Sequence, residues 1–151
     1  MKAYNQYEIG GYFFTIAEDN GFITMITLSN STVGYNFGET PLILKTKMEL
    51  EEYFEGKRTK FDIPLKFTGT CYQNKVWEEM TKISYGTIVS YQELARRCGN
   101  EKASRAIGNV CHNNKILILV PCHRVLAKNH LGGFGCGLDM KIKLLELEKV
   151  I

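Results

Sequence analysis

The apolar and polar positions in the first part of the chain have the pattern of a β-hairpin. Two runs rich in β-branched and aromatic residues, Tyr12 to Ala17 and Phe22 to Leu28, flank a turn that contains Asn20-Gly21. An Asn-Gly pair readily adopts the positive φ angles of a tight hairpin turn. The two runs are therefore predicted to pair as antiparallel strands.

A helix is expected to follow the hairpin and to begin at Thr46, because Thr46 and Glu49 have the spacing of a capping box. Its apolar face is formed by Leu50, Tyr53 and Phe54. Gly56 is a natural stop for this helix, and residues 61–65 have the pattern of a short extended segment. The first part of the chain is therefore predicted to be a small unit of strands and a helix.

Beyond residue 70 the apolar positions recur with helical spacing. The stripe of the first helix consists of Val76, Trp77, Met80 and Ile83. Ser90 and Glu93 form a capping box that opens a second helix, which Gly99 closes, and residues 103–113 have the pattern of a third. Two short helices joined by a turn containing glycine predict a helix-turn-helix, although an ordinary helical hairpin has the same pattern.

The last part of the chain places a buried segment before a cluster of reactive residues. The continuous apolar run 116–120 predicts a buried strand that leads into Pro121-Cys122-His123-Arg124. A glycine-rich loop, residues 132–137, follows. A final helix is expected, with Leu138, Ile142 and Leu145 on its apolar face.

The change in periodicity near Thr68-Gly69-Thr70 predicts two domains. Residues 1–68 would form a small α/β lobe, and residues 69–151 a mostly helical lobe, so that the fold class is α+β. Charge changes at the same place: residues 1–69 carry a net charge of −2 and residues 70–151 a net charge of +5. A basic second lobe suits a polyanion partner, but it is equally compatible with an ordinary solvated surface.

Composition excludes several classes of protein. With 44% hydrophobic and 23% charged residues the chain is a globular protein, and it has no apolar run long enough to span a membrane. The N-terminus has no apolar signal core, so we expect a cytoplasmic protein. The five cysteines include no CxxC pair, so neither a zinc site nor a disulfide framework is predicted.

Cys122 and His123 are the strongest candidates for chemistry. A thiol must become a thiolate to act as a nucleophile, and a nearby imidazole is the usual base. Glu146 or Glu148 on the final helix could orient that imidazole, which would complete a Cys-His-Glu relay. The alternative is that Cys122 is a small core residue and His123 a packing residue.

The residues around this pair resemble a known family. From Ser84 to Glu148 the sequence is similar to the active-site domain of O6-alkylguanine-DNA alkyltransferases, also called methylated-DNA–protein-cysteine methyltransferases. Residues 120–125, VPCHRV, match the signature hexapeptide of that family. Collinear matches are Tyr85-Gly86-Thr87, Val89-Ser90-Tyr91, Gly99-Asn100, Ser104 to Gly108, Asn114 and Leu144 to Glu148. The first half of the chain resembles the family only in its layout.

The resemblance implies a role for each matching residue of the reaction site. Cys122 would accept the alkyl group, and His123 would act as its base through a water while Glu148 holds the imidazole. Asn114 would brace the turn before the active-site segment. Tyr91 would lie against a flipped nucleotide and donate a proton to the departing guanine. The first lobe would be the ribonuclease-H-like domain of the family.

The resemblance also implies a DNA-binding set and a substrate pocket. Arg105 would enter the base stack where the nucleotide left. The other DNA-binding residues would be Tyr91, Ser104, Ala106, Arg97 and Cys111. The pocket would be lined by Val125, Gly133, Phe134, Gly135 and Cys136. The expected partner is double-stranded DNA that contains O6-alkylguanine. No metal, cofactor or membrane is expected, and the protein is expected to be a monomer.

The reaction would restore guanine and use each protein molecule once, because the thioether formed on Cys122 has no good leaving group. Three alternatives remain. A binding module related to the alkyltransferases would flip bases without reacting, but such relatives lack a cysteine at the position of Cys122. A cysteine hydrolase would give Arg105 no role. A helix-turn-helix regulator would leave residues 121–125 unexplained.

Overall fold

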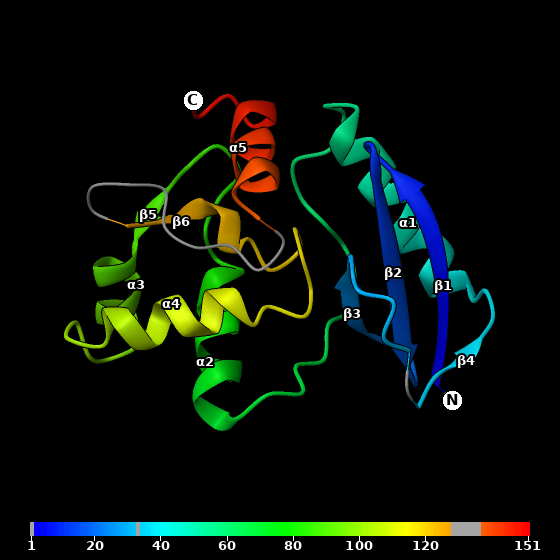
Figure 1. Ribbon diagram of the computed structural model, residues 1–151, viewed down its shortest axis with the longest axis horizontal. Helices are drawn as coiled ribbons and strands as arrows, with labels where there is room; N and C mark the ends of the chain where they lie inside the picture. The colour runs from blue at the N-terminus through cyan, green and yellow to red at the C-terminus, as the bar shows by residue number, and fades with distance from the viewer. Residues whose placement is uncertain (1, 33, 128–136) are drawn as a thin grey trace. The chain divides into compact units, whose positions relative to one another are not determined.

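The computed structural model describes residues 2–32, 34–127 and 137–151. The chain divides into two compact units, Met1–Phe67 and Thr68–Ile151 (Figure 1). None of the helices in these described ranges is long and apolar enough to cross a membrane. The two units are described separately below.

The N-terminal unit is built on a four-stranded sheet. Its strands are β1 (Lys2–Ile9), β2 (Tyr12–Asp19), β3 (Phe22–Thr27) and β4 (Asn36–Phe37). They lie in the order β3-β2-β1-β4, with β1, β2 and β3 antiparallel and β4 parallel to β1.

The predicted hairpin is confirmed in this sheet, because Asn20 and Gly21 join β2 to β3 with φ angles of 50° and 90°. The hydrophobic pattern did not predict β1, which pairs with β2 along its whole length. Its polar residues, such as Gln6 and Glu8, concealed the strand pattern.

The helix of this unit, α1 (Pro41–Phe54), begins five residues before the predicted start. Thr40 is its true N-cap and accepts a hydrogen bond from the Ile43 amide, and Pro41 occupies the first turn. Thr46 lies in the middle of the helix, where its hydroxyl donates to the carbonyl of Leu42. The prediction that Thr46 starts the helix was therefore wrong, because the spacing of Thr46 and Glu49 imitates a capping box.

The other expectations for this unit hold in part. Gly56 follows the helix with a φ of +76°, a left-handed conformation that favours glycine, which confirms the predicted stop. Leu50 and Tyr53 pack in the core with Phe14 and Ile16 of β2. Residues 61–65 form no full strand and make only an isolated bridge to β3 at its end.

Three helices form the first part of the C-terminal unit. They are α2 (Cys71–Met80), α3 (Tyr91–Arg97) and α4 (Ser104–His112), and α3 packs beside α4 (Figure 1). All four residues of the predicted stripe are buried, but only Val76, Trp77 and Met80 belong to α2, since Ile83 follows the end of the helix. The Trp77 indole donates to the carbonyl of Val110 at 3.2 Å, which ties α2 to α4.

The turn between α3 and α4 starts at Gly99, whose φ is +98°. Ser90 caps α3 as predicted, with its hydroxyl accepting from the Glu93 amide at 3.0 Å. The Glu93 carboxylate does not complete the capping box and instead pairs with Arg96 and Arg97. The two helices pack against each other across this turn, as both a helix-turn-helix and a helical hairpin would.

Residues 116–120 do not form the predicted strand. All five are buried, but the chain turns back on itself, with the Val120 amide donating to the Ile116 carbonyl at 3.1 Å. Ile118 has a φ of 71°, which is unusual for a β-branched residue. An apolar run reports burial and not backbone conformation, so sequence alone could not separate a buried turn from a buried strand.

The segment that carries Cys122 begins directly after this turn. Residues Cys122–Arg124 form a short 3-10 helix, η1, which is followed by β6 (Val125–Leu126). β6 pairs in parallel with β5 (Val89–Ser90), the two residues that precede α3. The pairing brings the segment that carries Cys122 next to the start of α3.

The last helix, α5 (Leu138–Leu147), buries a face that agrees only in part with the predicted one, because Leu145 is buried and Ile142 half-buried. Leu138 is 48% exposed, whereas Met140, Lys141, Leu144 and Leu145 are buried. The buried face therefore contains a lysine, and it continues to the buried Glu148 immediately after the helix. The helix packs against η1, and this tertiary contact, rather than apolar spacing alone, determines which side of α5 is buried.

Candidate active site

Cys122 lies at the start of η1 and has no exposed surface. The preceding Pro121 has a ψ of 65°, which turns the chain out of an extended conformation. The Val125 amide donates back to the Cys122 carbonyl and closes the 3-10 turn. Local backbone geometry therefore fixes the thiol within the unit.

Asn114 holds the Cys122 sulfur from the end of the α4 segment. Its side-chain amide donates to the Val120 carbonyl at 2.8 Å and to the Cys122 Sγ at 3.1 Å. Its Oδ1 atom accepts from the Ile116 amide at 2.9 Å. One side chain thus spans the buried turn from its first residue to the thiol, as the predicted bracing role requires.

His123 and Glu148 come together across the unit. Nε2 of His123 lies 2.7 Å from Oε2 of Glu148, and both side chains are buried. Because an ionised carboxylate only accepts hydrogen bonds, Nε2 carries the proton and Nδ1 keeps a lone pair. Nδ1 is buried and has no hydrogen-bond partner among the described residues. The imidazole is therefore in the form that can accept a proton.

The orienting carboxylate belongs to Glu148 and not to Glu146, which lies exposed on the surface of α5. Glu148 also accepts from the Arg124 Nε and Nη2 atoms at 2.9 and 3.0 Å, and from the Gly86 amide at 3.1 Å. Arg124 in turn donates to the Ile83 carbonyl at 2.7 Å. We refer to Glu148 with His123 and Arg124 as the buried fork.

Burial favours the neutral form of His123. Burial lowers the pKa of His123, and the charges of Arg124 and Lys141 act in the same direction. The hydrogen bond to Glu148 and the charge of Glu148 raise the pKa but do not outweigh burial. A neutral imidazole with a free Nδ1 is the form that a general base needs.

Lys141 is a member of this site that the sequence analysis did not identify. It is fully buried, and its Nζ donates to the Val125 carbonyl at 2.8 Å. The ammonium lies 5.9 Å from the centroid of the Tyr91 ring. Burial lowers the pKa of Lys141, and negative charge on Cys111 or Cys122 acts in the opposite direction. The sequence did contain a signal for this position. Lys141 precedes Leu144 by three residues and Glu148 by seven, a spacing that places all three on one face of a helix.

The predicted DNA-binding residues lie on α3 and α4 in different environments. Arg105 is exposed in the first turn of α4, while Ser104 and Ala106 beside it are half-buried. Arg97 is exposed and donates to Glu93 at 2.9 Å. Tyr91 is half-buried at the start of α3, close to Gly108 of α4.

Cys111 differs from its predicted position on a DNA-facing surface. Its side chain has no exposed surface, and burial raises the pKa of its thiol. Cys111 packs inside the unit and does not lie on the solvent-facing side of α4, so we leave it out of the helix surface that would face DNA. The apolar face of α4 decided its position, since Ile107 and Val110 are buried on the same side of the helix.

The substrate pocket is only partly described. Gly133, Phe134, Gly135 and Cys136 lie outside the described residues. Val125 is buried next to η1, and its carbonyl accepts from Lys141. Within the described ranges, no group of three or more His, Cys, Asp and Glu residues could hold a metal ion.

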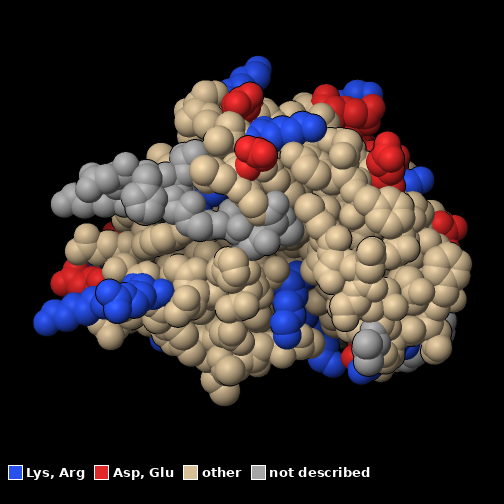
Figure 2. All heavy atoms as spheres, viewed as in Figure 1, with Lys and Arg blue, Asp and Glu red and all other residues tan. Residues whose placement is uncertain are grey.

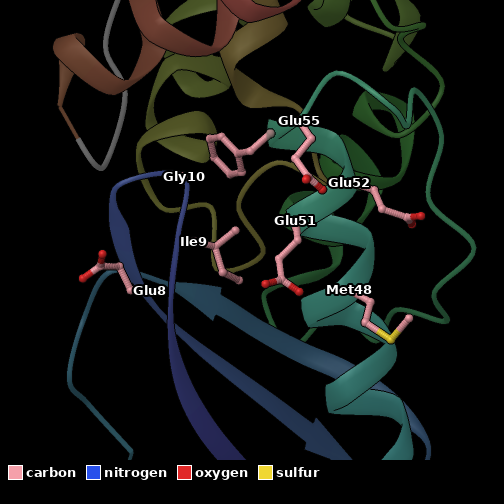
Figure 3. A pocket seen from close by; sticks show the side chains of 8 residues that line it. Glu8, Ile9, Gly10, Met48, Glu51, Glu52 and Glu55 are labelled. Carbon is pink, nitrogen blue, oxygen red and sulfur yellow. The ribbon is translucent and has the colours of Figure 1, made fainter.

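The two units differ in surface charge. Figure 2 shows basic side chains at the end of the C-terminal unit that carries the turn between α3 and α4, and acidic side chains near the C-terminal end of α1. A pocket of about 530 Å³ in the N-terminal unit is lined by Glu8, Glu51, Glu52 and Glu55 together with apolar residues (Figure 3). Its carboxylates repel phosphates, and its described lining includes no cysteine or histidine, so it does not suit alkyl transfer from DNA.

Comparisons with known proteins agree with this geometry. The model of the 6-O-methylguanine DNA methyltransferase DNA-binding domain matches residues 71–150, and that of the ribonuclease-like domain of the same proteins matches residues 2–67. A constitutive methylated-DNA–protein-cysteine methyltransferase of Bacillus subtilis is 38% identical over 145 residues, which are 89% of this chain and 88% of that protein.

A methylated-DNA–protein-cysteine methyltransferase of Haemophilus influenzae is 45% identical over 114 residues, which are 74% of this chain. The alignment spans 64% of that relative, which is less than two thirds of its length.

Solved structures show the same fold. The crystal structure of the Mycobacterium tuberculosis O6-methylguanine methyltransferase has a TM-score of 0.89 and 33% identity, with 99% of this chain and 93% of that chain covered. The structure of Mycobacterium tuberculosis OGT in complex with DNA has a TM-score of 0.89 and 34% identity, covering 97% of this chain and 92% of that chain. These matches confirm the expected α+β fold class, with a sheet-containing first lobe and a helical second lobe.

The family models match nearly the whole chain and the Bacillus subtilis relative aligns along most of both proteins, so this chain belongs to the 6-O-methylguanine DNA methyltransferase family.

Proposed function

We propose that this chain repairs DNA by transferring an alkyl group from O6 of guanine in duplex DNA to the Sγ atom of Cys122. The observation that carries the proposal is the buried Cys122 beside a neutral His123 whose Nε2 is held by Glu148. A soft thiolate is a suitable nucleophile for an alkyl carbon bonded to oxygen. Membership of the family supports this reaction over the cysteine hydrolase.

The proton and electron movements balance with the residues of this chain. The thiol proton of Cys122 passes through a water to Nδ1 of His123, and Glu148 stabilises the resulting imidazolium. The thiolate then forms the S–C bond while the C–O6 bond breaks and its electron pair goes to the guanine. Tyr91 donates its phenolic proton to the guanine, which leaves as neutral guanine. The thioether on Cys122 has no good leaving group, so each molecule acts once.

The burial of Cys122 supports a flipped nucleotide. The sulfur has no exposed surface, and O6 of guanine lies inside the stacked duplex, so the two atoms meet only if the nucleotide leaves the stack. Arg105 is exposed at the start of α4 and makes no ion pair with a described residue. Its planar guanidinium is suited to fill the vacated place in the stack.

The proposed partner is double-stranded DNA that contains O6-alkylguanine. Ser104, Ala106 and Tyr91 would contact the DNA beside Arg105, and Arg97 would contact phosphates. We also propose that the protein acts as a monomer. The cytoplasmic location stays a prediction.

Intact-mass analysis after incubation with duplex DNA containing O6-methylguanine tests the proposal. We expect the protein mass to increase by one methylene group and peptide mapping to locate the added group at Cys122. The variant Cys122→Ser should still bind the duplex but gain no mass, since a hydroxyl is a far weaker nucleophile at neutral pH. Loss of the DNA methyl group without a change in protein mass would instead support a hydrolase, and retention of the methyl group on DNA would refute the proposal.

A further inference from the structure

Tyr85 lies where the loop between α2 and β5 meets the buried fork, and the proposed reaction has so far given it no role. The loop turns at residues 84–87, where the Thr87 amide donates to the Ser84 carbonyl at 3.1 Å. Gly86, the third residue of this turn, has a φ of +76°, which glycine adopts readily. The turn brings the Tyr85 hydroxyl and the Gly86 amide to the C-terminal end of α5.

The loop contacts two of the three residues of the buried fork. Cζ of Arg124 lies over the Tyr85 ring, 5.7 Å from its centroid. The Ile83 carbonyl accepts from Nη1 of Arg124 at 2.7 Å, and the Gly86 amide donates to Oε1 of Glu148 at 3.1 Å. One short segment therefore meets the guanidinium through a ring and a carbonyl, and the carboxylate through an amide.

The hydroxyl of Tyr85 reaches the end of α5. It donates to the Leu147 carbonyl at 3.4 Å. Leu147 is the last residue of the helix, where carbonyls lack a partner within the helix, and Glu148 follows it directly. The contact thus ties Tyr85 to the backbone that carries the orienting carboxylate.

The hydrogen bonds of Arg124 lie in the plane of its guanidinium. Nε and Nη2 donate to Glu148, and Nη1 donates to Ile83. The two faces of a planar guanidinium carry no donor, so an aromatic ring can cover a face without the loss of a hydrogen bond. Tyr85 is half-buried and supplies such a ring, and only 7% of the Arg124 side chain stays exposed. The buried fork is thus nearly dry, although a partly exposed residue borders it.

We propose that Tyr85 is a positioning residue that closes the buried fork against water and so keeps His123 in the neutral form that accepts the proton of Cys122. The inference rests on the proposed function and adds a residue that acts on the base through Arg124 and Glu148. Water that reached these two side chains would compete for their hydrogen bonds and raise the local dielectric constant, which weakens the effect of burial.

The titration of His123 is the property that this closure controls. Burial has the largest influence and lowers the pKa of His123, the charges of Arg124 and Lys141 act in the same direction, and Glu148 acts in the opposite one. If water enters the buried fork, the effect of burial shrinks, so the pKa of His123 should rise toward its ordinary value. Burial raises the pKa of Tyr85, so its phenol stays protonated near neutral pH.

A purely structural role is the competing explanation, because Tyr85 also joins the loop to α5. Tyr85→Ala removes the ring and the hydroxyl, whereas Tyr85→Phe keeps the ring over Arg124 and loses only the hydroxyl. Tyr72→Ala, at an exposed position of α2, is the matched control for the loss of a tyrosine. A structural role alone would lower stability without moving the titration of His123.

The first measurement is the pH titration of His123 in the free protein by NMR with labelled histidine. The variant His123→Gln identifies its signal among those of the three histidines. We expect the titration midpoint to rise by about half a pH unit or more in Tyr85→Ala, since relief of burial raises the pKa of an imidazole. It should keep the wild-type value in Tyr85→Phe and in Tyr72→Ala.

The second measurement is the single-turnover rate of methyl transfer from duplex DNA between about pH 5 and pH 8. The rate should fall at low pH as His123 takes up a proton, so its acid limb should move upward in Tyr85→Ala together with the His123 midpoint. At pH 6 this variant should be slower than the wild type by about threefold or more, and the two rates should converge toward pH 8. Tyr85→Phe should follow the wild-type profile.

Folded Tyr85→Ala with the wild-type His123 midpoint and the wild-type acid limb would overturn the inference and leave Tyr85 as a packing residue. If Tyr85→Ala does not fold, the same two measurements on Tyr85→Leu decide the matter, because leucine keeps an apolar side chain but is too small to cover the guanidinium as the ring does. A wild-type protein that transfers no methyl group would refute the proposed function. The NMR titration would still test the closure by Tyr85, so the two failures are distinguishable.

Discussion

Two carboxylates of the C-terminal unit, Glu148 and Glu93, each pair with two nitrogen-bearing side chains, but Glu148 is buried whereas Glu93 lies at the surface with exposed partners. The buried fork joins Glu148 to His123 and Arg124 at 2.7 to 3.0 Å. On the surface of α3, Glu93 accepts from Arg96 and Arg97 at 2.7 to 2.9 Å, and we refer to these three residues as the exposed fork. Their distances are nearly the same.

The difference in solvent gives the two forks different uses. Water and salt screen the exposed fork and can replace either partner, so its arginines are free to exchange Glu93 for a DNA phosphate. Nothing replaces a partner in the buried fork, so removal of one charge leaves the other uncompensated. Burial thus makes the first fork a fixed part of the reaction site and leaves the second as an adjustable surface.

The largest effect is expected from Glu148→Gln, which removes the shared charge of the buried fork. Arg124 would remain buried without its counter-charge, and breaking such a pair costs about 3–5 kcal/mol of stability. The amide would stabilise the His123 imidazolium less, so methyl transfer should slow by about tenfold to a thousandfold. Chemical denaturation and single-turnover kinetics measure the two effects.

Glu146→Gln, at an exposed position of the same helix, is the control for this variant and should leave both quantities unchanged. If Glu148→Gln is as stable as the wild type, burial does not make the charge of Glu148 more important for stability than the charge of Glu93.

Arg105→Ala tests a surface arginine that lies outside both forks. If the guanidinium fills the vacated stack, its loss should slow repair of methylated duplex by about tenfold or more, since an extruded nucleotide costs a few kcal/mol. Reaction with free O6-benzylguanine has no stack to open and should keep its rate. Lys102→Ala removes a neighbouring exposed charge and is the control. Equal losses on both substrates would remove the stacking role.

The stability of the buried fork should depend on pH near neutrality. Burial lowers the pKa of His123 in the folded protein, so folding favours the neutral imidazole. Its contribution is complete above about pH 6.5, the usual pKa of the unfolded residue, and is lost as the pH falls toward the lowered value. The free energy of unfolding should therefore decrease between pH 7 and 5, by at most about 1.4 kcal/mol per unit.

The exposed fork should not contribute to that decrease, because the two arginines lower the pKa of Glu93 to about 2. The contribution of Glu93 to stability is therefore lost only at pH values below the usual pKa of a glutamate. His123→Gln should flatten the pH dependence, and His112→Gln, at an exposed position, should not. This account would be contradicted if His112→Gln flattened the pH dependence of the free energy of unfolding and His123→Gln did not.

The smallest effect is expected from Glu93→Gln, which releases Arg96 and Arg97 in the exposed fork. Both arginines would then be available to phosphates, so DNA affinity at low salt should rise a few-fold and fall more steeply as salt is added. Glu78→Gln removes one exposed carboxylate from α2 and controls for net charge. Identical salt dependence in the two variants would place Arg96 and Arg97 outside the DNA interface.

Some features of this protein follow from short stretches of sequence. The Asn20-Gly21 turn, the stripe of α2 and the Ser90 cap of α3 are all set by neighbours within a few residues, and the structure confirms them. The hexapeptide around Cys122 predicted both the proposed nucleophile and the histidine next to it, because both belong to one contiguous motif. Such patterns are readable because local hydrogen bonds and helical spacing produce them.

Tertiary structure decided the remainder. Apolar spacing could not show that residues 116–120 turn back at Ile118, that α5 buries Lys141, or that Glu148 rather than Glu146 orients His123. These outcomes depend on contacts between distant segments, such as the one between Gly86 and Glu148, which are 62 residues apart. A local sequence pattern indicates that a position is buried. It does not indicate which residue will pair with a buried charge, because that partner comes from a distant segment and is fixed only when the whole unit packs.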